Sequence, residues 1–304
     1  MIDYFIIVII FVVLEGIMYL IDLPFKNRIK NSDSVESSLK TRKNLKITRI
    51  VSTILLISLL CVVTIYMCVE NNTMEFLSKS IALIIAYAIT KGYKMLTGNI
   101  QTYSKERYLN KYKSNFVFYL RSFESDFYTK SNNAFGLESQ LAKAIKKRGL
   151  EIAAIGMTKE LDAPVGASRV YVGDETWKAD VAEMMQNAKM IFILMSDRES
   201  CIWEISNGAG MLNKICFIID NTDKYDNIRK STSGTINFPE IDVLLAQLNN
   251  KITKEVINAG ESLVGFAMSG NELDVFDFCA TDKPAKINIK IDEVKQKGRA
   301  FANL

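Results

Sequence analysis

The segment MIFILMSDRESCIWEISNGAGMLNKICFII, residues 190–219, contains two short apolar runs separated by a sequence with helical spacing. The runs Met190–Met195 and Ile215–Ile219 hold no charged side chain and are rich in isoleucine and phenylalanine, which favours strands buried on both faces. Residues Ser200–Leu212 between them are predicted to form a helix. Because a helical crossover joins neighbouring parallel strands, this segment predicts a β-α-β unit of a parallel sheet.

The same alternation of strands and helices extends toward the N-terminal side of this segment. Apolar strands are predicted at Phe116–Leu120 and Ile152–Ile155, with a helix over Gly136–Arg148 between them. Arg169–Val172 has an alternating pattern, in which Arg169 could reach a phosphate but is more commonly a solvated side chain at a strand edge. Asp174 can cap the helix that follows. We therefore expect an α/β fold with a flavodoxin-like parallel sheet.

The region after this segment gives weaker indications. The polar stretch Asn221–Asn237 is predicted to be a long loop, and Glu240–Asn249 is predicted to be a helix. Lys286–Ile291 alternates as a strand would, and Glu293–Leu304 has the pattern of a terminal helix. No chemistry is assigned to this tail.

The composition excludes several kinds of site. The chain has 304 residues and no histidine, so Ser-His-Asp triads, Cys-His pairs and histidine-ligated zinc are excluded. Its five cysteines are scattered without a C-x-x-C pair, so we expect no disulfide framework, no metal site and a reducing compartment. Residues 114–304 carry 23 basic and 26 acidic side chains, a balance that argues against nucleic acid as a partner.

Three apolar segments lie in the first hundred residues. Ile50–Val69 is an uninterrupted run of 20 uncharged residues, long enough to cross a hydrocarbon core of about 30 Å as a helix. Tyr4–Leu23 is apolar apart from Glu15 and Asp22, and Phe76–Leu96 has a shorter uncharged centre. The sequence therefore predicts the lipid bilayer as a partner, with spans at about residues 4–23, 50–69 and 76–96.

The charge distribution predicts how these spans are oriented. The loop Lys26–Arg49 holds eight basic side chains against two acidic ones, and short loops of this kind stay in the cytoplasm. Three spans then place the C-terminal domain in the cytoplasm too, as expected for a multi-pass protein of the cell (inner) membrane. Glu15 lies near the middle of the first span, where a carboxylate is costly. An ion path or subunit contact, and a protonated side chain without a function, both stay open for it.

Polar side chains follow the predicted strands at the places where a parallel sheet binds its ligands. Such ligands lie outside the carboxyl ends of the strands. Arg121, Ser122 and Phe123 follow the first strand, and Ser196 follows Met190–Met195. Guanidinium and hydroxyl groups suit a phosphate-bearing ligand such as a nucleotide. No G-x-G-x-x-G follows the first strand and no P-loop motif is present, which disfavours an ordinary Rossmann dehydrogenase and a P-loop NTPase.

Four features between about residues 115 and 220 carry a resemblance to a known family. They are Leu-Arg-Ser-Phe at 120–123, a strand ending at Gly156, Pro-Val-Gly-Ala-Ser-Arg-Val-Tyr-Val at 164–172, and the pair Trp203-Glu204. Together they resemble TIR-type domains, especially the membrane-anchored TIR-like proteins of bacteria. In enzymatic TIR domains, a glutamate in the helix after the fourth strand cleaves the glycosidic bond of NAD. Residues after the first strand hold the nucleotide.

The resemblance implies a catalytic role for Glu204 and ligand contacts for five other residues, namely Arg121, Ser122, Phe123, Ser196 and Trp203. The family places its glutamate about one helical turn after the tryptophan. Glu204 instead directly follows Trp203, so the two side chains diverge by about 100° around a helix. A carboxylate can stabilise the oxocarbenium character that develops when NAD is cleaved. The alternative is that Glu204 is an exposed first-turn residue that interacts only with its helix N-terminus.

The sequence as a whole predicts four regions and two functions. The regions are transmembrane helices in 1–98, a basic linker helix in 99–113, a TIR-like α/β domain in 114–250 and a C-terminal extension in 251–304. The first function is a membrane-anchored TIR-like signalling or defence protein that binds, and in one version cleaves, a nucleotide such as NAD. No cofactor is assigned, and NAD is the candidate substrate. The second is a non-catalytic sensor or scaffold that forms homo-oligomers and uses its transmembrane helices as the effector.

Overall fold

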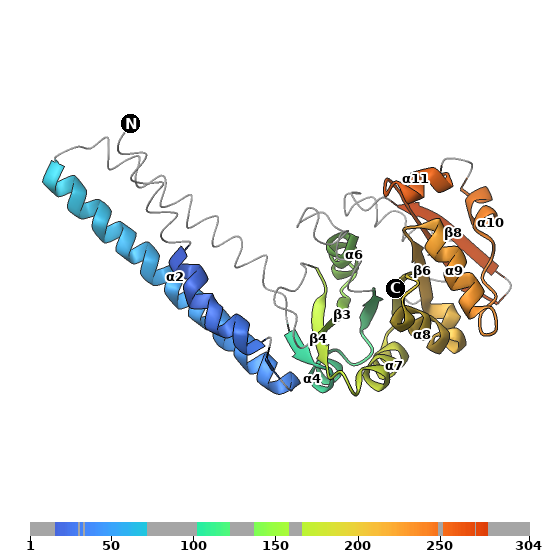
Figure 1. Cartoon of the computed structure of the whole chain (residues 1–304), viewed down its shortest axis with the longest axis horizontal. Helices are drawn as coiled ribbons and strands as arrows, with labels where there is room; N and C mark the ends of the chain where they lie inside the picture. Colours follow the sequence, from blue (N-terminus) through green and yellow to red (C-terminus); the bar gives the residue numbers. More distant parts are fainter. Residues whose placement is uncertain are drawn as a thin grey trace. The chain divides into compact units, whose positions relative to one another are not determined.

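The computed structural model describes the chain in several stretches, and its contacts divide it into two units, one before and one after about residue 100 (Figure 1). The described residues are 16–29, 31–32, 34–71, 102–121, 137–157, 166–248, 252–270 and 272–278. Glu15, the predicted third span 76–96 and the predicted elements Lys286–Ile291 and Glu293–Leu304 lie outside these residues.

The first unit contains a helical hairpin. Residues 16–29 are helical, and after a short connection α2 extends from Val35 to Asn71. Arg49 of α2 forms an ion pair with Asp22 of the preceding helix, with 2.6 Å between Nη2 and Oδ2. The Nε atom of Arg49 also donates to both oxygens of that carboxylate at 3.0 Å. The ion pair therefore links Asp22, at the end of the first predicted span, to Arg49, just before the second.

Among the described residues, no helix combines the length and the apolar composition that crossing a membrane requires. This finding contradicts the predicted location as a multi-pass protein of the cell membrane. The predicted second span, Ile50–Val69, is not a helix of its own. It continues a helix whose first part carries five basic residues, namely Lys40, Arg42, Lys43, Lys46 and Arg49. The prediction considered the apolar run apart from the charged residues that precede it in the same helix.

The second unit is built on an eight-stranded sheet. Its strands are β1 (Thr102–Ser104), β2 (Phe116–Leu120), β3 (Glu151–Met157), β4 (Ser168–Val172), β5 (Met190–Leu194), β6 (Ile215–Ile219), β7 (Leu263–Ser269) and β8 (Glu272–Phe278). The five neighbouring pairs from β1 to β6 are parallel, and β7 and β8 extend the sheet as antiparallel strands. The predicted α/β class with a mostly parallel sheet is thus confirmed.

The order of the strands differs from the flavodoxin-like order that we expected. The strands lie in the order β1-β4-β3-β2-β5-β6-β7-β8. Numbered along the chain, the five parallel strands from β2 to β6 stand in the order 3-2-1-4-5, which is found in dinucleotide-binding sheets, whereas flavodoxin-like sheets have 2-1-3-4-5. β2, β5 and β6 are apolar throughout, so their sequences predict that they are buried and not which strands are their neighbours.

Helices cover both faces of the sheet (Figure 1). Successive residues of β2 point to opposite faces, so Phe118 lies in one apolar cluster and Val117 and Tyr119 in the other. The first cluster includes, among others, residues from α7 (Trp177–Asn187), α8 (Glu199–Asn207) and α9 (Thr222–Thr232). The second includes Leu137, Leu141 and Ile145 of α6 (Leu137–Lys146). The sheet is therefore a central layer with its strand ends free to build a site.

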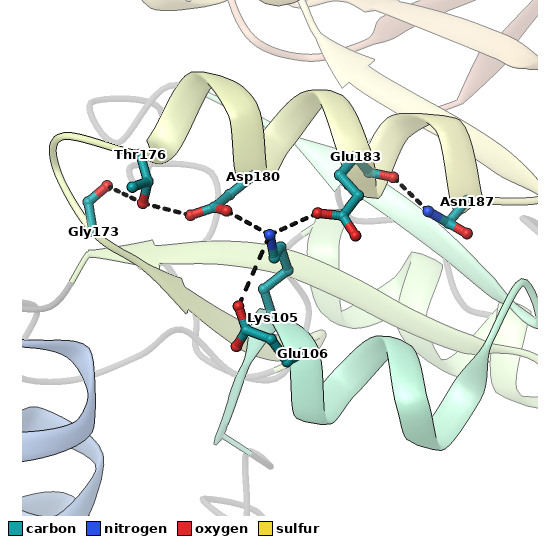
Figure 2. A network of polar contacts seen from close by, with 7 residues as sticks. All are labelled: Lys105, Glu106, Gly173, Thr176, Asp180, Glu183 and Asn187. Atoms are coloured by element: carbon teal, nitrogen blue, oxygen red, sulfur yellow. Dashed lines mark hydrogen bonds and ion pairs between the residues drawn. The ribbon is translucent and has the colours of Figure 1, made fainter.

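Residues 102–112 belong to the sheet unit rather than to a separate linker. They form β1, which pairs with β4, and the helix α4 (Lys105–Tyr112). Figure 2 shows the Lys105 amine between two carboxylates of α7, at 2.8 Å from Asp180 and 2.6 Å from Glu183. These contacts raise the pKa of Lys105, chiefly through its hydrogen bonds to Asp180 and Glu183. The basic residue thus attaches α4 to α7.

The stretch predicted as a long loop, Asn221–Asn237, is largely the helix α9. The side chain of Asn221 accepts a hydrogen bond from the backbone N–H of Lys224 at 2.9 Å, which caps the first turn. Tyr225 and Ile228, three residues apart, are fully buried on its inner face. The prediction of a loop was wrong because this helix is mostly polar and buries few apolar side chains, chiefly Tyr225 and Ile228.

The remaining elements surround the last two parallel strands. The predicted helix after β5 is α8 followed by a 3-10 helix, η2 (Ala209–Lys214), and the predicted helix Glu240–Asn249 is α10 (Ile241–Ala246). A short helix, α11 (Lys254–Asn258), precedes the hairpin of β7 and β8. This hairpin lies beyond the predicted domain limit at residue 250, so part of the predicted C-terminal extension completes the sheet.

Candidate functional site

A cavity of about 390 Å³ lies at the carboxyl ends of β2, β3 and β4. The direction in which the parallel strands are added reverses between β2 and β5, and ligands of open α/β sheets bind beside such a reversal. Residues at the end of β2 form one part of the wall, and α8, which follows β5, forms another. The cavity thus lies where this class of sheet places its ligands, and its volume is within the usual range for small-molecule sites.

Glu204 lies in the second turn of α8 and lines this cavity. Its side chain is buried, with 7% of the residue exposed, so it is not the exposed first-turn residue of the alternative interpretation. Among the described residues, no side chain forms a hydrogen bond or ion pair with its carboxyl group. Burial alone raises the pKa of Glu204 to about 8, because desolvation disfavours the carboxylate.

The wall beside Glu204 is aromatic and partly apolar. Trp177 lines the cavity, and its ring packs edge-to-face against Trp203 with 5.0 Å between ring centroids. Trp203 itself does not line the cavity, and the Lys178 amine lies over both rings at 5.9 and 5.7 Å. Asp174, which the sequence suggested as a helix cap, lines the cavity instead, and Thr176 occupies the N-cap position.

Behind Arg121, which lines the cavity, lies a buried charge cluster made of Arg121, Glu138 and Arg169. Glu138 of α6 accepts hydrogen bonds at Oε2 from Arg121 Nε at 3.1 Å and from Arg169 Nη2 at 3.0 Å. Its Oε1 accepts from the backbone N–H of Ala167 at 3.0 Å and lies 2.8 Å from Arg169 Nη1. Arg121 lines the cavity, and Arg169 has no exposed surface. The Arg121 guanidinium is therefore held at the end of the sheet by its ion pair with the buried Glu138 carboxylate.

The sheet register explains how the fully buried Arg169 fits. Arg169 lies beside Ala154 in the pairing of β4 with β3, and Ala154 lies beside Tyr119 in the pairing of β3 with β2. Because Ala154 projects only a methyl group, it leaves space between the two long side chains. Gly166 brings the chain close to α6, since a Cβ atom there would be 3.0 Å from the backbone of Glu138. The expectation of a solvated Arg169 was wrong because a helix covers this strand.

The structure brings two of the predicted site residues, Arg121 and Glu204, to one cavity. Ser122 and Phe123 lie outside the described residues. Ser196 is buried away from the cavity, and its backbone N–H donates to the Cys201 sulfur at 3.3 Å. Burial raises the pKa of Cys201 far above its ordinary value, so this thiol is not an activated nucleophile.

Sequence reasoning missed Tyr119, Ser200 and the role of Glu138. Tyr119 and Ser200 line the cavity, and Glu138 has no exposed surface. A signal existed for Tyr119, whose hydroxyl is the one polar side-chain group in the strand Phe116–Leu120. Glu138 gave no such signal, because a glutamate near the start of a helix is common for reasons unrelated to a site.

No known protein family matches this sequence, and no curated protein and no solved structure was found to be similar to the chain.

Proposed function

We propose that the sheet unit binds NAD, or a nucleotide of the same class, in the cavity at the ends of β2, β3 and β4, and that Glu204 is its catalytic carboxyl group. This is the activity that the resemblance to TIR domains implies. The observation that carries the proposal is a buried carboxyl group that lines a ligand-sized cavity without a partner among the described residues. A perturbed carboxyl group in a cleft is a common property of catalytic sites.

The chemistry follows from the charge of the substrate. The nicotinamide ring of NAD is cationic, so its arrival beside Glu204 favours the carboxylate and releases the proton that burial retains near pH 7. When the bond between the ring and the ribose breaks, its electron pair stays with the ring, and positive charge develops on the sugar. The Glu204 carboxylate stabilises that charge, and water adds to the sugar carbon. The products are nicotinamide, ADP-ribose and a proton.

The test measures nicotinamide release and NAD binding by the full-length chain and by Glu204→Gln. Glutamine keeps the size of the side chain and removes its charge, so we expect turnover to fall by about 100-fold or more while NAD affinity changes only a few-fold. Glu199→Gln is the matched control, since Glu199 is an exposed residue in the first turn of the same helix. It should leave turnover unchanged.

Three outcomes would separate the parts of this proposal. Full turnover in Glu204→Gln contradicts the catalytic assignment. NAD binding without turnover in the wild-type chain indicates a non-catalytic ligand sensor in the same cavity. Neither binding nor turnover contradicts the proposed function as a whole.

A further inference from the structure

Tyr119 presents a buried hydroxyl group whose hydrogen-bonding capacity is unused in the described part of the chain. Only 1% of the residue is exposed, and its Oη atom has no hydrogen-bond partner among the described residues. A buried hydroxyl without a partner costs free energy, so native proteins pair nearly all of them. Tyr119 also lines the cavity, where a ligand can supply the missing partner.

The surroundings of this hydroxyl favour an anionic partner. Tyr119 and Arg121 are two residues apart at the end of β2, so they follow the same face of the sheet, and both line the cavity. Burial raises the pKa of Tyr119, while the Arg121 guanidinium acts in the opposite direction. The hydroxyl therefore stays protonated near neutral pH and can donate a hydrogen bond. A donor beside a guanidinium group suits a phosphate oxygen.

Arg121 is held in place from behind by the charge cluster. Its Nε atom donates to Glu138, which is itself bound by Arg169 and by the backbone of Ala167. A guanidinium fixed in this way loses little side-chain entropy when it binds an anion. Glu204 lies on α8, on the other face of the sheet, so the cavity has a cationic side and an acidic side.

We propose that the Tyr119 hydroxyl and the Arg121 guanidinium form an anion subsite of this cavity, which binds a phosphate group of the ligand. The proposal rests on the proposed function only in taking the cavity as the ligand site. It assigns the phosphate-bearing part of the ligand to the α6 side and the reacting part to the α8 side.

The test uses inorganic pyrophosphate as the probe and titrates it into the full-length chain at constant ionic strength by calorimetry. Tyr119→Phe removes only the hydroxyl and should weaken pyrophosphate binding about tenfold or more. Tyr108→Phe is the matched control. Tyr108 is also fully buried with an Oη atom that has no partner among the described residues, but it lies in an aromatic cluster with Tyr112 and Phe116. The affinity of Tyr108→Phe for pyrophosphate should stay within twofold of the wild-type value.

Neither variant should lower the melting temperature, because each removes a buried polar group that lacks a partner in the described structure. A purely structural role for Tyr119 would make the two variants behave alike, and equal pyrophosphate affinities would overturn the subsite. Absence of saturable pyrophosphate binding to the wild-type chain would overturn it too. Pyrophosphate binding that depends on Tyr119 in a chain that neither binds nor cleaves NAD would support the subsite and contradict the proposed function. NAD cleavage that is insensitive to Tyr119→Phe would support the proposed function and contradict the subsite.

Discussion

Glu138 and Glu204 are two buried carboxyl groups on opposite faces of the same sheet, and their surroundings differ. Glu138 is held by two guanidinium groups and one backbone N–H, and it has no exposed surface. Glu204 borders a cavity and has no side-chain partner among the described residues. A buried carboxylate that is fully paired supports structure, whereas one that is left unpaired costs stability and marks a place for a ligand.

The largest effect on stability is expected from removing Glu138, the paired carboxylate. Glu138→Ala leaves the guanidinium groups of Arg121 and Arg169 buried without their shared carboxylate, so the free energy of unfolding should fall by about 3–5 kcal/mol. Urea denaturation measures it. Asp242→Ala is the control, because its ion pair with Lys254 is exposed, and it should change the free energy of unfolding by less than about 1 kcal/mol. Equal effects of the two variants would show that the buried cluster does not stabilise the fold.

An intermediate effect is expected from Glu204, the carboxyl group without a side-chain partner in the described structure, through the pH dependence of stability. The unfolded chain ionises Glu204 near pH 4.5, whereas the folded chain keeps it protonated until about pH 8. Because the unfolded state then binds fewer protons, this group makes stability fall as pH rises through that window, by about 3 kcal/mol between pH 5 and pH 8. Glu204→Gln should remove this contribution, so the difference between variant and wild type should grow with pH. A constant difference across the window would mean that Glu204 is solvated or paired.

The smallest effect is expected at the partly exposed ion pairs of Lys105 with Asp180 and Glu183 (Figure 2). The side chains of Lys105 and Asp180 are only 17% and 13% exposed, whereas that of Glu183 is 47% exposed, so water and salt screen these pairs in part. Lys105→Met should lower the free energy of unfolding by about 1 kcal/mol. The loss should shrink further in 0.5 M salt, whereas the loss in Glu138→Ala should change little because its partners are buried. Denaturation of both variants at low and high salt measures this contrast. Equal salt sensitivity would contradict the assigned difference in burial.

The sequence by itself determined the apolar central strands of the sheet unit and the sheet edge at which the candidate cavity lies. The apolar runs at 116–120, 190–194 and 215–219 are strands because only a pleated, doubly covered layer buries every side chain of such a run. Placing a site at the carboxyl ends of these strands follows from parallel topology, and Arg121 and Glu204 do line one cavity there. The apolar run 50–69 predicted a membrane span from its length alone, although charged residues precede it in the same helix.

Only the tertiary structure decided the strand order, the burial of Arg169 and the partners of each glutamate. Strand order depends on which apolar surfaces pack together, and strands of similar composition do not encode it. Glu138 and Arg169 are 31 residues apart in the chain, so their contact exists only once α6 covers β4. Glu138 and Glu204 are both glutamates within a helix, so their positions in the sequence do not reveal their different surroundings. Their different roles come from the groups that folding places around them, because the cost of a buried carboxylate depends on its partners.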